Sequence, residues 1–303
     1  MAVETTTFSN NSADTWFRDI MFDCVLCPRA CHVNRLAGQT GYCGQTAELM
    51  AARASLHYWE EPCISGTSGS GTVFFSGCNL RCVFCQNHNI ALGKAGRVIA
   101  PEHLAEIFLQ LQEQGANNIN LVTPTHFLPQ IVIALEQAKQ QGLHLPIVYN
   151  TGSYESPEAL RHLEGLVDIY LPDLKYFSPE LSTAYSHAPD YFETACAAIS
   201  EMYRQVGDSV IDEDTGLMQH GMIVRHLLLP GQTKDSKKIL RYLHETYGDH
   251  IYISIMNQYT PLPQVADIEV LNRTVTPEEY DRVLRFAERI GIERGFRQEG
   301  TAA

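Results

Sequence analysis

Cys78, Cys82 and Cys85 are the residues of this chain whose type and spacing best indicate chemistry, with the pattern Cys-x3-Cys-x2-Cys. They follow the apolar run 72–75, which is typical of a buried strand. Three thiolates this close together can bind three irons of a [4Fe-4S] cluster and leave the fourth iron without a protein ligand. Such an iron can bind a small molecule, whereas a closed structural site uses four protein ligands. A zinc site that lacks one ligand, or a chance group of cysteines, is the alternative.

A second group, Cys24, Cys27, Cys31 and Cys43, has the spacing Cys-x2-Cys-x3-Cys-x11-Cys. Four thiolates can complete a tetrahedral zinc site or bind a second [4Fe-4S] cluster. Zinc ribbons usually contain two Cys-x2-Cys pairs, and this group contains one. The spacing therefore favours iron–sulfur ligation, while zinc and uncoordinated thiols stay open as alternatives.

From residue 72 onward, short β-branched or aromatic runs alternate with helical patterns. The predicted strands are 72–76, 118–122, 146–149, 167–171, 221–229 and 251–255. The predicted helices are 101–114, 127–141, 156–164, 190–206, 233–246 and 277–290. This alternation requires a parallel sheet with right-handed crossovers, so we predict an α/β fold built as a partial (β/α)6 barrel. Chemistry in such barrels gathers at the carboxyl ends of the strands. We predict a surface loop at the acidic stretch 207–220, with a lid over the barrel mouth as the alternative.

The segment SGCNLRCVFC at residues 76–85 resembles the signature of the radical S-adenosyl-L-methionine (radical SAM) superfamily. Together with the cysteine quartet and RHLLLPG at 225–231, it is similar to the PflX-type proteins, homologues of pyruvate formate-lyase activating enzyme, over about residues 21 to 290. The resemblance implies that the open iron binds S-adenosylmethionine and that one electron breaks its sulfonium–C5′ bond. The resulting 5′-deoxyadenosyl radical then takes a hydrogen atom from the substrate. Phe84 is implied to lie beside the adenine.

The resemblance also implies cofactor contacts for polar side chains that follow the predicted strands. These are Thr123, Thr125, Asn150, Asp173, Lys175, Arg225 and Asn257. Activating enzymes usually have Gly-Gly-Glu after the second strand, whereas this chain has TPTH at 123–126. Uncharged hydroxyls and carbonyls of Thr123 and Thr125 would therefore replace the carboxylate. In the Asp-Leu-Lys motif, Asp173 would accept from the ribose hydroxyls and Lys175 would pair with the methionine carboxylate, a structural salt bridge being the alternative. Arg225 could grip a carboxylate with two hydrogen bonds, and Asn150 offers both a donor and an acceptor. His126 could be a catalytic base or a packing histidine.

The cysteine content, net charge and hydrophobicity of the chain indicate its cellular compartment and the kinds of partner that it can bind. The chain has nine cysteines and no charged-then-apolar signal pattern, which indicates metal ligation in a reducing compartment rather than a disulfide framework. A net charge of −13 without a Lys/Arg-rich run speaks against binding to nucleic acid. No run of about 18 apolar residues is present, so no membrane span is expected. We therefore predict a cytoplasmic protein.

We predict a flexible leader at 1–20, a cysteine-rich metal-binding module at 21–65 and the barrel at 66–303. The resemblance implies a radical SAM oxidoreductase that abstracts hydrogen from a protein, a peptide or a small molecule. A glycyl-radical-enzyme activase is one form that it suggests, with a reduced flavodoxin- or ferredoxin-type electron donor. The alternatives are an RNA-modifying radical enzyme and a non-catalytic iron–sulfur or zinc protein that acts as a scaffold or electron carrier. No cysteine follows Cys196, which speaks against the radical methyl synthases.

Overall fold

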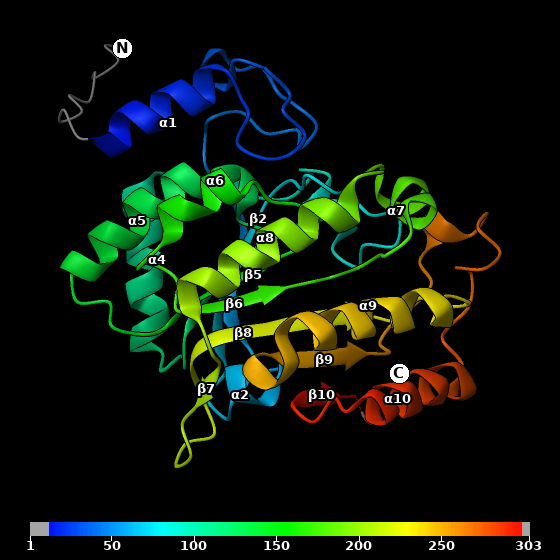
Figure 1. Ribbon diagram of the computed structural model, residues 1–303. Helices are drawn as coiled ribbons and strands as arrows, with labels where there is room; N and C mark the ends of the chain where they lie inside the picture. The colour runs from blue at the N-terminus through cyan, green and yellow to red at the C-terminus, as the bar shows by residue number, and fades with distance from the viewer. Residues whose placement is uncertain (1–11, 299–303) are drawn as a thin grey trace, which may run out of the picture.

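The β-branched and aromatic runs of the sequence form a parallel sheet in the computed structural model, which describes residues 12–298 (Figure 1). The parallel strands of its centre are β2 (Ser70–Phe75), β4 (Ile119–Val122), β5 (Ile147–Thr151), β6 (Ile169–Pro172), β8 (Met218–Leu227) and β9 (Tyr252–Met256). Each pairs with the next in this order. The order agrees with right-handed crossovers that carry the chain steadily along an open sheet. The prediction of a partial (β/α)6 barrel is confirmed.

Further strands extend both edges of this sheet. β1 (Met50–His57) pairs antiparallel with β2, β3 (Arg97–Val98) pairs antiparallel with β1, and β10 (Gly295–Arg297) pairs parallel with β9. Because β1 is part of the sheet, the domain boundary predicted between residues 65 and 66 falls inside the barrel unit. Only the segment before β1 lies outside the strands as a separate cysteine-bearing module.

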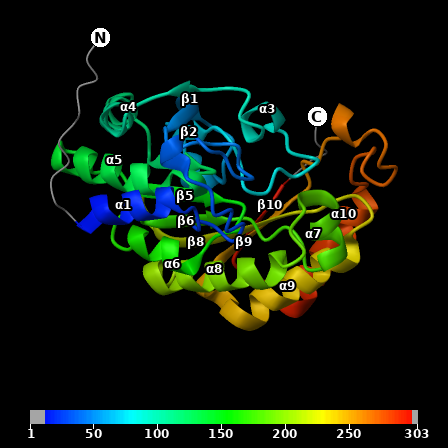
Figure 2. The same ribbon diagram turned by 90° about the horizontal axis from the view of Figure 1, so that it is seen from above.

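Helices cover the outer face of the sheet in an arc (Figure 2). The helices of the described residues, among which α2 instead lies on the inner face, are α1 (Ser12–Phe22), α2 (Pro62–Ser65), α3 (His88–Ala91), α4 (Pro101–Glu113), α5 (Leu128–Gln140), α6 (Pro157–Leu160), α7 (Pro179–Ser186), α8 (Tyr191–Val206), α9 (Thr233–Tyr247) and α10 (Pro277–Ile290). Proline occupies the first turn of many of them, where its missing N–H group has no helical partner in any case. At α10, Thr276 and Glu279 also form a capping box.

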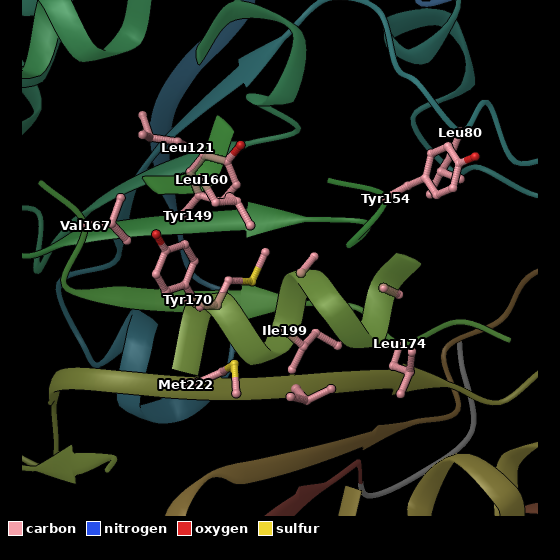
Figure 3. Packing of buried hydrophobic residues seen from close by; sticks show 14 of the residues in the cluster. Leu80, Leu121, Tyr149, Tyr154, Leu160, Val167, Tyr170, Leu174, Ile199 and Met222 are labelled. Carbon is pink, nitrogen blue, oxygen red and sulfur yellow. The ribbon is translucent and has the colours of Figure 1, made fainter. Parts of the chain in front are cut away.

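Side chains alternate between the two faces of the sheet. Tyr149, Tyr170 and Met222 lie in the outer core with Ile199 of α8, as Figure 3 shows. The next residues along the strands face inward, and their apolar members pack against α2: Val148, Ile169, Leu171 and Ile223 against Cys63 and Ile64. Two-residue periodicity then places polar side chains further along the same inner face, toward the carboxyl ends. The helix α2 therefore covers the amino-terminal part of the inner face, and the polar part lies beyond it.

Two sequence predictions about irregular segments need correction. Residues 12–22 form α1 rather than part of a flexible leader, because Met21 is fully buried and Phe17 and Ile20 pack against the core. The rest of the predicted leader, residues 1–11, lies outside the described residues. The stretch 207–220 contains β7 (Val210–Ile211), which pairs antiparallel with the start of β8. It lies at the amino end of β8, so it does not cover the barrel mouth.

Candidate functional site

The loop after β2 brings the three predicted cluster cysteines together at the carboxyl edge of the sheet. Burial, followed by the neighbouring thiols of Cys82 and Cys78, raises the pKa of Cys85 to about 12. Burial and then Cys82 also raise the pKa of Cys78. Donors reach two of the sulfurs: the Leu80 N–H lies 3.3 Å from Cys78 Sγ, and the Ser186 hydroxyl lies 3.0 Å from Cys82 Sγ. Cys78, Cys82 and Cys85, the cysteine trio, are thus one buried and two partly buried thiols that influence one another electrostatically.

Arg225 is the centre of a hydrogen-bonded network on the inner face. Its Nη1 lies 2.9 Å from Glu60 Oε2, its Nη2 lies 2.6 Å from Asn150 Oδ1, and its Nε lies 2.9 Å from Asp173 Oδ1. Asn120 Nδ2 donates to the second oxygen of Glu60 at 3.2 Å. The structure therefore joins three predicted residues, Asn150, Asp173 and Arg225, through direct contacts.

Lys175 extends the network toward the cysteine trio. Its Nζ lies 2.5 Å from Asp173 Oδ2. Burial alone would raise the pKa of Asp173, but the charges of Arg225 and Lys175 outweigh burial and lower it. The ammonium of Lys175 also lowers the pKa of Cys78 and Cys85, against the larger effect of burial. Lys175 therefore lies within electrostatic reach of the thiols and connects the two halves of the site.

The structure places Thr125 outside this network. Its hydroxyl is buried and donates to Glu155 Oε1 at 2.6 Å, and the Thr151 hydroxyl donates to the same oxygen at 2.5 Å. A buried carboxyl group requires such donors, and the threonines at the ends of β4 and β5 supply them. The hydroxyl of Thr125 is therefore engaged by Glu155, and a contact of the Thr125 carbonyl with a cofactor remains a prediction.

Three other predicted residues lie along the carboxyl edge. Thr123 is half-buried with φ of +56°, and its N–H donates to the Asn150 carbonyl at 2.9 Å. The Asn257 N–H donates to Gln298 Oε1 at 2.9 Å. Phe84 is buried, and its ring meets three tyrosines edge-on: Tyr176, Tyr185 and Tyr259. Contacts of these residues with a cofactor remain predictions.

Sequence reasoning missed Glu60 and Glu61 as site residues. Both come from the loop between β1 and α2, and Glu60 bonds to Arg225, which is 165 residues away. Glu61 is buried beside Ser254, and burial raises the pKa of its carboxyl group. The available signal was a pair of adjacent carboxylates directly before Pro62, at a place where a strand passes into the short helix α2.

The N-terminal cysteine quartet lines one pocket. Its walls are Cys24, Leu26, Cys27, Arg29, Ala30, Cys31, Arg35, Gly41, Cys43 and His126. His126 is buried, which lowers its pKa to about 3, and its Nε2 lies 2.6 Å from the Ser76 carbonyl. Of the two roles considered for His126, this environment supports a packing histidine rather than a catalytic base.

The donor set of the trio fits an iron–sulfur cluster. Within residues 12–298, no three Cys, His, Asp or Glu side chains form a group that could hold a single metal ion. A [4Fe-4S] cluster differs, because each thiolate binds a different iron and the sulfurs need not meet at one point. The thiols at residues 78, 82 and 85 are soft ligands on one loop, with hydrogen-bond donors to two sulfurs and a lysine nearby.

The model of the radical SAM superfamily matches residues 72–243. The chain therefore belongs to this superfamily, which implies a [4Fe-4S] cluster and S-adenosylmethionine as cofactors. An uncharacterised protein of Methanocaldococcus jannaschii is 27% identical over 286 residues, which cover 91% of this chain and 77% of that protein. The pyruvate formate-lyase-activating enzyme of Clostridium pasteurianum is 29% identical over 121 residues, which cover 37% of this chain and 48% of that enzyme.

Among solved structures, the FeFe-hydrogenase maturase HydG of Carboxydothermus hydrogenoformans has a TM-score of 0.50 and 12% identity. The match covers 74% of this chain and 57% of that protein, and it indicates a likeness of fold alone. No helix within the described part of the chain is long and apolar enough to span a bilayer.

Proposed function

We propose that this protein is a radical SAM enzyme that cleaves S-adenosylmethionine reductively and abstracts hydrogen from a protein or peptide. The observation that carries the proposal is the position of Lys175, which reaches the cysteine trio electrostatically and pairs with Asp173. An amino-acid ligand at an open iron would meet this ammonium and this carboxylate together.

The cluster and S-adenosylmethionine supply, when bound, a 5′-deoxyadenosyl radical through one-electron cleavage of the sulfonium–C5′ bond. In this proposal, Cys78, Cys82 and Cys85 hold the cluster, and Lys175 pairs with the methionine carboxylate. Asp173 accepts from the ribose hydroxyls.

Arg225 and Asn150 orient this arrangement from the inner face. Arg225 Nε lies 2.9 Å from Asp173 Oδ1 and holds the carboxylate in place. Asp173 Oδ2 would meanwhile exchange Lys175 for the ribose hydroxyls. Asn150 accepts from Arg225 and is fixed in turn by Glu60. Thr123, Phe84 and Asn257 are proposed to border the ligand at the carboxyl edge.

A protein or peptide is the proposed substrate class, with a small molecule as the alternative. The similarity to a pyruvate formate-lyase-activating enzyme supports this choice, since that relative's name describes action on another enzyme. The electron donor in this proposal is a reduced flavodoxin- or ferredoxin-type protein. A glycyl radical enzyme would be one target of this kind.

The cleavage step is tested on anaerobically reconstituted protein reduced with dithionite, with 5′-deoxyadenosine as the measured product. Cys82→Ala is expected to abolish the product, whereas Cys196→Ala on α8 should leave it unchanged. Lys175→Gln should weaken S-adenosylmethionine binding at least roughly tenfold, because a hydrogen bond to a charged group contributes about 1.5–3 kcal/mol. Lys234→Gln, at an exposed position of α9, is its matched control. Persistence of the product in Cys82→Ala would overturn the catalytic assignment.

The substrate class is tested by deuterium transfer. A deuterated cell extract is separated into a macromolecular and a small-molecule fraction, and each is added to the reduced enzyme with S-adenosylmethionine. Deuterium in 5′-deoxyadenosine with the macromolecular fraction supports a protein substrate, provided that protease treatment of this fraction removes the transfer. Transfer from the small-molecule fraction alone would contradict the protein-substrate proposal.

A further inference from the structure

The pocket of the cysteine quartet has the features of a built ligand site. Its enclosed space has room for about one water molecule, and the volume of about 330 Å³ is reached only when open solvent is included. Arg35 is 1% exposed in its wall, with Nη2 2.6 Å from the Thr46 carbonyl and Nη1 2.7 Å from the His126 carbonyl. The Nδ1 atom of His126 is buried in the same wall without a partner among the described residues.

The chain also wraps closely around the quartet sulfurs. A Cβ atom at Gly41 would lie 2.7 Å from Cys31 Sγ, so a side chain at that position would displace the sulfur. The N–H of Tyr42 donates to the same sulfur at 3.3 Å. Backbone N–H groups that point at thiols are a common way to stabilise anionic thiolates around a metal centre.

Arg29 connects this pocket to the loop of the cysteine trio. It lies between Cys27 and Cys31 in sequence, and its guanidinium donates to three backbone carbonyls of the barrel. Nε lies 2.8 Å from the Asn79 carbonyl, Nη2 lies 2.9 Å from the Ser186 carbonyl, and Nη1 lies 2.5 Å from the His187 carbonyl. The guanidinium also lies 3.9 Å from the centre of the Tyr42 ring, which is part of the quartet segment.

The carbonyls that Arg29 holds belong to residues next to the trio. Asn79 directly follows Cys78, and its side-chain amide donates to the Tyr154 carbonyl at 2.6 Å. Ser186 donates its hydroxyl to Cys82 Sγ at 3.0 Å. One arginine of the quartet segment therefore fixes backbone positions on both sides of the trio sulfurs.

We propose that Cys24, Cys27, Cys31 and Cys43 hold a second [4Fe-4S] cluster, and that Arg29 transmits the order of that centre to the trio loop. The single Cys-x2-Cys pair of the quartet favours an iron–sulfur cluster over a zinc ribbon. The guanidiniums of Arg29 and Arg35 in the pocket wall suit a centre with net negative charge. The second half of the proposal rests on the proposed function, whereas the first half does not.

The metal is tested by counting iron, sulfide and zinc per chain after anaerobic reconstitution. Wild type should contain about eight irons, and a variant with alanine at all three trio positions should keep about four. Cys27→Ser with Cys31→Ser should also keep about four, located in the trio, and Cys196→Ser should match wild type. One zinc per chain, or the absence of iron, in the trio variant would overturn the proposal.

The trio variant keeps the quartet intact, so the metal test does not depend on folding of the quartet variants. It also separates the two proposals. Wild type with about eight irons but no 5′-deoxyadenosine would refute the proposed function and leave the second cluster in place. Wild type that cleaves S-adenosylmethionine but contains only about four irons would refute the second cluster and leave the proposed function in place.

The coupling is tested with Arg29→Gln, which cannot hold three carbonyls at once. Its iron content should equal that of wild type, while amide hydrogen exchange of residues 78–85 should become at least tenfold faster and 5′-deoxyadenosine formation at least tenfold slower. Arg285→Ala, at an exposed position of α10, is the matched control. Unchanged exchange in the trio loop of Arg29→Gln would refute the coupling, whatever the cleavage rate.

Discussion

Glu155 should make the stability of this protein depend on pH in a way that a single substitution removes. The side chain is 1% exposed, and three hydroxyl groups surround its Oε1 atom: those of Thr125, Thr151 and Tyr149, at 2.6, 2.5 and 3.4 Å. Burial raises the pKa of Glu155 to about 7 from a usual value of 4.5, although these hydrogen bonds partly oppose the shift. The folded protein therefore favours the neutral acid.

The sign and size of the effect follow from this pKa. The pKa is higher in the folded state, so the contribution of Glu155 to stability is fully present below pH 4.5 and is lost as the pH rises through about 7. A difference of about 2.5 pKa units corresponds to about 3.4 kcal/mol in total. Between pH 5.5 and pH 8.5 the loss is about 2 kcal/mol.

The assay is anaerobic urea unfolding of reconstituted wild type and Glu155→Gln, followed by circular dichroism at both pH values. The glutamine keeps the shape of the side chain but does not titrate. The stability of wild type relative to the variant should therefore fall by about 2 kcal/mol from pH 5.5 to pH 8.5. Glu136→Gln, at an exposed position of α5, should show no such change. A difference between wild type and Glu155→Gln that stays constant with pH would refute the reasoning.

Further substitutions test the inner face, the backbone and the trio loop. Glu60→Ala should lower the free energy of unfolding by about 3 kcal/mol in urea titrations, because it removes the carboxylate that pairs with Nη1 of Arg225. Gly221→Ala should lower the free energy of unfolding by more than about 2 kcal/mol. Gly221 has φ of +118°, and an added Cβ atom would lie 2.4 Å from the Cα atom of Ser209. Gly165→Ala, with φ of +76° and open space, should cost only about 1 kcal/mol. Ser186→Ala removes the donor to Cys82 and should lower the reduction potential of the reconstituted cluster, measured by redox titration with electron paramagnetic resonance detection.

The fold could be predicted from the sequence because its signals are local. Each central strand is a short run of β-branched or aromatic residues, and each long helix has one apolar face. The prediction for 277–290 matches α10 at both ends, since Pro277 and Gly291 mark them. The leader prediction failed at residues 12–20 because it relied on the polar and acidic composition of the N-terminus and overlooked the helical spacing of the apolar residues that pack against the core.

The site could be predicted in part, according to how far apart its partners lie. Asn150 and Arg225 lie near the carboxyl ends of β5 and β8, and Asp173 directly follows β6, so the rule that chemistry gathers at strand ends finds all three. Glu60 enters the same network from a loop before the first parallel strand, and no spacing rule relates it to a partner 165 residues away. Thr125 also follows a strand, but its hydroxyl is taken by a carboxyl group 30 residues later, which no local pattern reveals.

The ionised groups of the inner face form a balanced set of charges that bears on the ligand proposed for it. Glu60 and Asp173 carry negative charge, Arg225 and Lys175 carry positive charge, and direct ion pairs join them at 2.5–2.9 Å. If Lys175 pairs with the methionine carboxylate as proposed, Asp173 keeps Arg225 at 2.9 Å, and the ribose hydroxyls would donate to the oxygen that Lys175 leaves. A phosphate in the same place would compete with the two carboxylates and would bring no cation for them. This electrostatic balance supports the proposed placement of the methionine carboxylate of S-adenosylmethionine, rather than a nucleotide phosphate, beside Lys175.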